Sequence, residues 1–71
     1  MNVKFNKTEI LETLENKNLT AFNSFKLSMA EQIELGNLVI VNHYPNESPI
    51  QESTVISTIQ ELNDWFEQFE R

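Results

Sequence analysis

The chain has 71 residues, no cysteine, one glycine, two prolines and a formal net charge of −6 at pH 7. This length suits one small domain and leaves no room for separate catalytic and binding lobes. The composition excludes disulfides and thiolate zinc sites, and a single histidine, His43, makes an all-protein zinc site very hard to build. We therefore expect residues 1–71 to form one small acidic domain whose core stands alone or is completed by another chain.

The first predicted element is a short helix that begins at Asn6. Asn6 and Glu9 have the spacing of a capping box, in which the Asn6 side chain accepts a hydrogen bond from the amide of Glu9. Phe5 and Ile10 have the spacing of a hydrophobic staple. A polar run at 15–18 should end this helix after about ten residues, and a helix this short needs a packing partner.

The segment 19–27 alternates apolar and polar residues, a pattern that favours a half-buried strand. A helical interpretation through Phe22, Phe25 and Met29 remains open, because these residues also recur at helical spacing.

The segment 28–38 admits a helix or a hairpin. A second capping box at Ser28 and Glu31 and the only glycine, Gly36, at the far end favour a helix. The alternative is a hairpin that turns at Gly36-Asn37. We prefer the helix, because the sequence Met-Ala-Glu-Gln is weak strand sequence.

The clearest predicted strand is Leu38 to Tyr44. Its continuous apolar run predicts burial on both faces, so helices should cover both. The residues from Pro45 through Pro49 are predicted to form a loop.

A long C-terminal helix is predicted from Thr54 to Phe69, with Ser53 or Thr54 as its cap. Its apolar residues recur at spacings of 4, 3, 4 and 3, which predicts a face buried in the core. A coiled-coil seam or a docking helix is the alternative. The residues of this stripe are Val55, Ile59, Leu62, Phe66 and Phe69.

Together these elements predict a small α+β domain in the order α-β-α-β-α, with a two- or three-stranded sheet packed under the long C-terminal helix. A two-stranded sheet has exposed edges and is marginal in water. We expect that a homodimer, formed through the strand at 38–44 or through the C-terminal helix, could complete it.

The charge is unevenly distributed along the chain. Residues 1–30 carry a net charge of +1, residues 31–71 carry −7, and no Lys or Arg occurs from Leu27 to Glu70. Such a surface repels phosphate backbones and anionic membranes, so we expect no direct binding of nucleic acid and no membrane association. The same field attracts a basic protein surface. No signal peptide or membrane span is recognisable, and we expect a cytoplasmic protein.

Sequence patterns of catalysis and of metal or cofactor binding are weak. His43 is the only side chain with a pKa that is ordinarily near neutral, and a strand-end histidine is more often structural than catalytic. His43 and Glu47 would supply two metal ligands where three or four are needed. One glycine cannot form a phosphate-binding loop. We expect no enzyme and no cofactor, and keep a small enzyme or metal protein centred on His43 as the least favoured alternative.

The leading functional hypothesis is a non-enzymatic acidic protein-binding domain, an inhibitor or nucleic-acid mimic that occupies a basic surface of another protein. Acidic inhibitors of this size are common among phage and mobile-element products that act against host defence, which is an analogy of class only. An antitoxin-like module, whose acidic C-terminal half neutralises a basic toxin, is the alternative. Trp65 lies at the edge of the apolar stripe beside acids, as an interface anchor or as rim packing against the first helix. The predicted partner-binding residues are Glu31, Glu34, Glu47, Glu52, Glu61, Asp64, Trp65 and Glu67.

Overall fold

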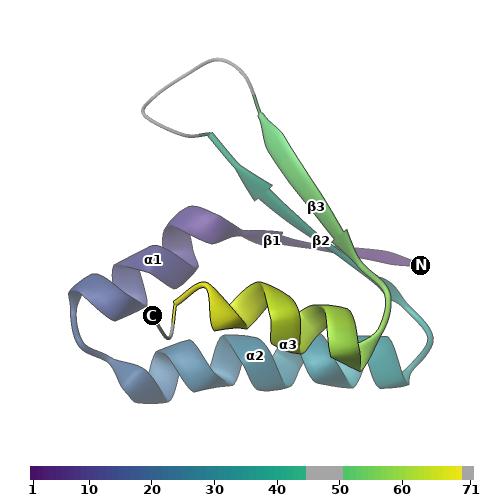
Figure 1. Ribbon diagram of the computed structural model, residues 1–71, viewed down its shortest axis with the longest axis horizontal. Coiled ribbons are helices and arrows are strands. Elements are labelled where there is room, and N and C mark those ends of the chain that lie inside the picture. Colours follow the sequence, from purple (N-terminus) through teal and green to yellow (C-terminus); the bar gives the residue numbers. More distant parts are fainter. Residues whose placement is uncertain (45–50, 70–71) are drawn as a thin grey trace.

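The computed structural model describes residues 1–44 and 51–69 (Figure 1). The predicted loop from Pro45 through Pro49 lies outside the described residues. The fold is a small α+β domain, as predicted, but its order is β-α-α-β-β-α. Its elements are β1 (Asn2–Asn6), α1 (Lys7–Glu15), α2 (Leu19–Glu34), β2 (Leu38–His43), β3 (Glu52–Ile56) and α3 (Ile59–Glu67).

The three strands form one mixed sheet in the order β1-β2-β3. β1 runs parallel to β2, with Asn2 opposite Leu38 and Asn6 opposite Asn42. β3 runs antiparallel to β2, with Ile56 opposite Val39. The two helices α1 and α2 make the crossover between the parallel strands, as parallel pairing requires. The central position of β2 leaves β1 and β3 as the two edge strands.

All three helices lie on the same side of the sheet (Figure 1). α2 and α3 run antiparallel to each other beneath the strands, and α1 extends from the end of β1. The fully buried core lies between the two layers, and each of α1, α2, β2, β3 and α3 contributes to it. Its members are Ile10, Phe22, Met29, Val39, Val41, Ile56, Leu62 and Phe66.

The prediction that helices cover both faces of β2 is wrong. Val39 and Val41 are buried on the helix side, whereas Leu38 is 40% exposed on the other side and Val55 of the neighbouring strand is 53% exposed. The four consecutive apolar residues at the start of β2 therefore give a half-buried strand the sequence pattern of a fully buried one. Because β2 pairs on both edges, it also cannot pair edge to edge with a copy of itself.

The first helix forms where it was predicted, and it is preceded by a strand that was not. Asn6 caps α1, but its side chain accepts from the amide of Thr8 at 2.9 Å and not from Glu9. β1 alternates exposed and half-buried residues, with Val3 and Phe5 on the helix side of the sheet.

The predicted strand at 19–27 is wrong, because these residues form the first half of α2. Asn18 caps this helix by accepting from the amide of Ala21 at 3.1 Å. Phe22 and Met29 are buried on its inner face, which is the helical alternative that the spacing left open. The preferred helix over the following residues is confirmed, and the hairpin at Gly36-Asn37 does not form.

The predicted long C-terminal helix is also wrong in its first third. Residues 52–56 form β3, and a separate helix of nine residues, α3, follows with Thr58 as its N-cap. The β-branched run of Thr54, Val55 and Ile56 suits a strand that pairs with the apolar β2. The buried stripe consequently begins at Leu62, and α2, with 16 residues, is the longest helix.

Candidate functional site

Three of the predicted partner-binding residues lie together on α3. Asp64 and Trp65 follow Glu61 by three and four positions, so each of them neighbours Glu61 on the surface of the helix. Leu62 and Phe66 are buried, and their burial sets the rotation of α3 that leaves these three residues around a hollow beside β3. The buried residues therefore determine how α3 packs, and this packing positions Glu61, Asp64 and Trp65.

Glu61 has a structural role at the start of α3. The Thr58 hydroxyl accepts from the amide of Glu61 at 3.1 Å, and the Glu61 carboxylate accepts from the hydroxyls of Ser57 at 2.8 Å and Thr58 at 3.2 Å. This is a variant of the capping box, and a carboxylate in the first turn also stabilises the helix dipole. Glu61 is thus held in place, but part of its hydrogen-bonding capacity is already used.

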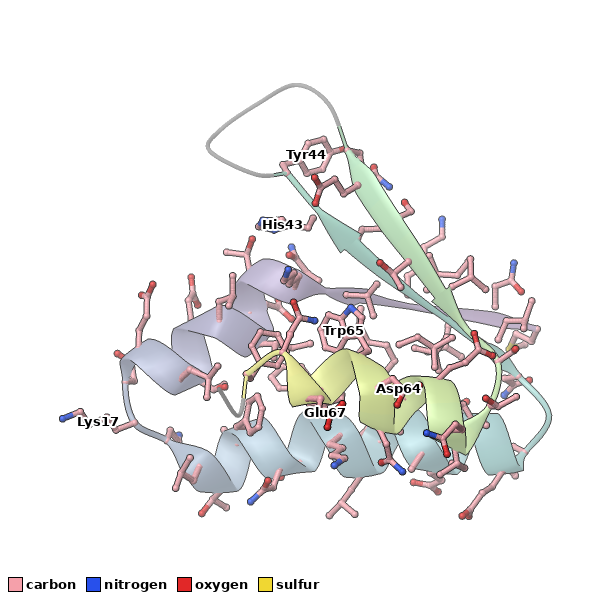
Figure 2. All side chains as sticks on the ribbon, viewed as in Figure 1. Lys17, His43, Tyr44, Asp64, Trp65 and Glu67 are labelled. Carbon is pink, nitrogen blue, oxygen red and sulfur yellow. The ribbon has the colours of Figure 1, made fainter. Side chains whose placement is uncertain are left out.

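Asp64 and Trp65 differ in how far they reach into the domain. Figure 2 shows Trp65 between α3 and the sheet, with the carboxylate of Asp64 on the outer side of the helix. Trp65 is half-buried and packs edge to face on Phe66 and Phe69, with ring centroids 4.9 and 5.1 Å apart. Asp64 is exposed and accepts from the side-chain amide of Gln60 at 3.0 Å.

A shallow hollow of about 330 Å³ joins these residues to β3. Trp65 therefore adjoins β3, and it keeps an accessible surface beside two carboxylates. We call this hollow the α3–β3 groove. It is lined by Thr54, Val55, Ile56, Glu61, Asp64 and Trp65.

The other predicted acids that the structure describes do not line the α3–β3 groove. Glu31 and Glu34 are exposed on the last turns of α2, and Glu67 is exposed at the last position of α3. Glu52 is exposed at the start of β3, opposite His43. Glu47 lies outside the described residues.

A second hollow, of about 470 Å³, lies at the end of the sheet beside Asn42 and Tyr44, and sequence reasoning missed it. The Tyr44 hydroxyl donates to Gln51 Oε1 at 2.8 Å, and Gln51 Nε2 donates to Asn42 Oδ1 at 2.8 Å. Ser53 Oγ also donates to Asn42 Oδ1, at 2.7 Å. These hydrogen bonds pair the polar side chains that β2 and the start of β3 contribute beside the hollow. The hollow is also lined by Lys4, Phe5, Asn6 and Glu9 of β1 and α1. Its residues therefore come together through the pairing of β2 with both β1 and β3, which the spacing of residues along the chain does not predict.

His43 faces the helix side at the end of β2, in line with Val39 and Val41. Its Nδ1 atom is buried and has no hydrogen-bond partner among the described residues. Within residues 1–44 and 51–69, no three His, Cys, Asp or Glu side chains are grouped so that they could hold a metal ion. None of the helices in the described ranges is long and apolar enough to cross a membrane.

No known protein family, no curated protein and no solved structure matches this chain.

Proposed function

We propose that this chain is a non-enzymatic protein-binding domain whose acidic surface occupies a basic surface of another protein. The observation that carries the proposal is the exposure of every described acid in the second half of the chain. These are Glu31, Glu34, Glu52, Glu61, Asp64 and Glu67. No Lys or Arg occurs between residues 27 and 69 of the sequence, while Lys7 and Lys26 of the first half approach α3 at Gln68 and over the Phe66 ring. Trp65 adds an aromatic surface of the kind that anchors interfaces.

Nucleic-acid-binding proteins are the partner class that fits best. Their basic surfaces are shaped to neutralise a dense array of negative charge, and an acidic domain competes for the same surface. In this proposal the chain is an inhibitor or nucleic-acid mimic of the phage or mobile-element type, and it acts in the cytoplasm. It binds neither nucleic acid nor membrane itself.

The test is displacement of DNA-binding proteins from immobilised DNA. Proteins of a cell lysate that are retained on DNA-cellulose are eluted with the full chain, and the affinity of each displaced protein is then measured at two salt concentrations. The Debye length falls from about 30 Å at 10 mM salt to about 8 Å at 150 mM salt, so affinity should fall by about tenfold or more over this range. Binding that does not respond to salt would overturn the proposal.

Two triple variants with the same charge change locate the surface. E31Q/E34Q/D64N removes three charges from the second half, and E9Q/E12Q/E15Q removes three from α1. The first variant should bind the displaced protein more weakly than the second. Equal losses would contradict an acidic surface confined to the second half of the chain.

A further inference from the structure

β3 is an edge strand next to the α3–β3 groove. It pairs with β2 on one side, and within the described residues no strand pairs with its other side. Four of its five residues are exposed, and only Ile56 is buried. An edge of this kind presents unpaired backbone N–H and C=O groups, which are the groups that an added strand binds.

The groove lies where the side chains of an added strand would project. Successive side chains of a strand point to opposite faces of the sheet, so every second residue of an added strand would face the helix layer. The helix layer beside β3 presents Trp65, Asp64 and Glu61. An added strand would thus gain backbone hydrogen bonds from β3 and side-chain contacts from α3.

We propose that the free edge of β3 and the α3–β3 groove bind an extended segment of the partner by strand addition, and that the segment carries Lys or Arg at alternate positions. The basic side chains would lie beside Asp64 and Glu61, and their methylene stems would cover the ring of Trp65. This inference rests on the proposed function and adds to it the shape of the bound element.

The charges disfavour a second copy of this chain as the occupant. Pairing of two β3 edges would bring Glu52, Glu61 and Asp64 of one copy close to the same carboxylates of the other, and like charges at close range repel. β3 is also short, at five residues, and short charged edge strands resist self-association. A basic segment meets no such repulsion.

The probe is an acetylated and amidated nine-residue peptide of alternating Lys and Val, titrated into the full chain at low salt. The single tryptophan, Trp65, lies in the groove and reports binding by its fluorescence. Two further peptides carry N-methyl groups on the odd-numbered or on the even-numbered amides, because a strand directs alternate N–H groups to opposite edges. Methylation of at least one set should weaken binding by about tenfold or more, the effect of losing several backbone hydrogen bonds.

A matched pair of variants locates the bound segment. Asp64→Asn and Glu67→Gln each remove one exposed carboxylate from α3, and only Asp64 lines the groove. The Asn variant also keeps an oxygen for the hydrogen bond with Gln60. We expect Asp64→Asn to weaken binding of the Lys-Val peptide by about two- to fivefold, the range for one exposed ion pair, and Glu67→Gln to change it less.

The inference is overturned if both methylated peptides bind as tightly as the parent, if Asp64→Asn and Glu67→Gln weaken binding equally, or if the parent peptide does not bind. Each of these outcomes leaves the salt-dependent capture of a basic protein intact, so failure of strand addition is distinguishable from failure of the proposed function.

Discussion

Phe22 of α2 and Phe66 of α3 meet edge to face in the core, with ring centroids 5.4 Å apart and ring planes at 71°. Phe22 makes a second edge-to-face contact with Phe69, at 5.7 Å. Lys26 lies over the Phe66 ring, with its Nζ atom 5.7 Å from the centroid. These contacts attach α3 to α2 and thereby fix the position of the α3–β3 groove.

Replacing Phe66 with alanine should lower the free energy of unfolding by about 3–5 kcal/mol, because Phe66 is buried and loses its packing partners. Urea denaturation followed by circular dichroism measures this change. Leu27→Ala is the matched control, because Leu27 is 71% exposed on α2 and its loss should cost about 0.5 kcal/mol or less. Equal costs for the two substitutions would contradict the burial of Phe66 in the core.

The ends of α1 and α2 use the same backbone motif with different residues. The amide of Asn18 donates to the Thr13 carbonyl, and that of Lys17 donates to Leu14. At the end of α2, the amides of Asn37 and Gly36 donate hydrogen bonds to carbonyls of α2 with the same spacing. Each motif places one residue at positive φ, and these are Lys17 at 55° and Gly36 at 86°.

Substitutions at these two positions should therefore have opposite effects on stability. Lys17→Gly removes the strain of a side chain at positive φ and should raise the free energy of unfolding by about 0.5–1 kcal/mol. Gly36→Ala introduces that strain and should lower it by about 1 kcal/mol, although a Cβ at Gly36 would meet no atom within 4 Å. Thermal melts of both variants measure these changes in stability. Stability changes of the same sign in both variants would contradict a positive φ at Lys17 and Gly36.

Thr58 is the N-cap of α3 and stands between β3 and α3 in the chain. Thr58→Ala removes the acceptor for the Glu61 amide and should cost about 1 kcal/mol of folding free energy. Thr58→Ser keeps the hydroxyl and should restore most of the loss. If alanine and serine behave alike in urea denaturation, the hydroxyl is not the cap.

His43 carries a buried ring nitrogen that lacks a hydrogen-bond partner among the described residues. His43→Leu replaces that nitrogen with an apolar group on the same face as Val41, and it should leave stability unchanged or raise it by about 1 kcal/mol. His43→Gln keeps polar atoms at the site and should be the less stable of the two. A loss of more than about 1 kcal/mol in the leucine variant would show that the nitrogen makes a stabilising interaction.

Short sequence motifs correctly predicted the elements whose formation depends on neighbouring residues. The Asn6 cap, the glycine end of α2 and the apolar run of β2 each act over a few neighbouring residues, and each marks an element that forms. The acids and Trp65 of α3 were recognisable as a candidate surface for the same reason, because helical spacing places them together.

The errors arose where pairing partners far along the chain decide the structure. The pattern at 19–27 satisfies both strand and helix periodicity, and burial of Phe22 against Phe66 selects the helix. Val55 continues the apolar spacing of α3, yet pairing with Ile40 draws it into β3. The α3–β3 groove was missed in consequence, because a continuous helix has no strand edge beside Trp65. The start of α3 was nevertheless marked by Thr58 and Glu61, which have capping-box spacing.

The parallel pairing of β1 with β2 has a consequence for synthesis on the ribosome. Asn2 is synthesised before Leu38 and must wait for it before it has a strand to pair with. Until Leu38 is made, α1 and α2 have no completed sheet to cover their apolar faces. The edge of β3 is made later still, so a ribosome-bound chain completes its sheet and adds the acidic residues of α3 only after it has made both β3 and α3.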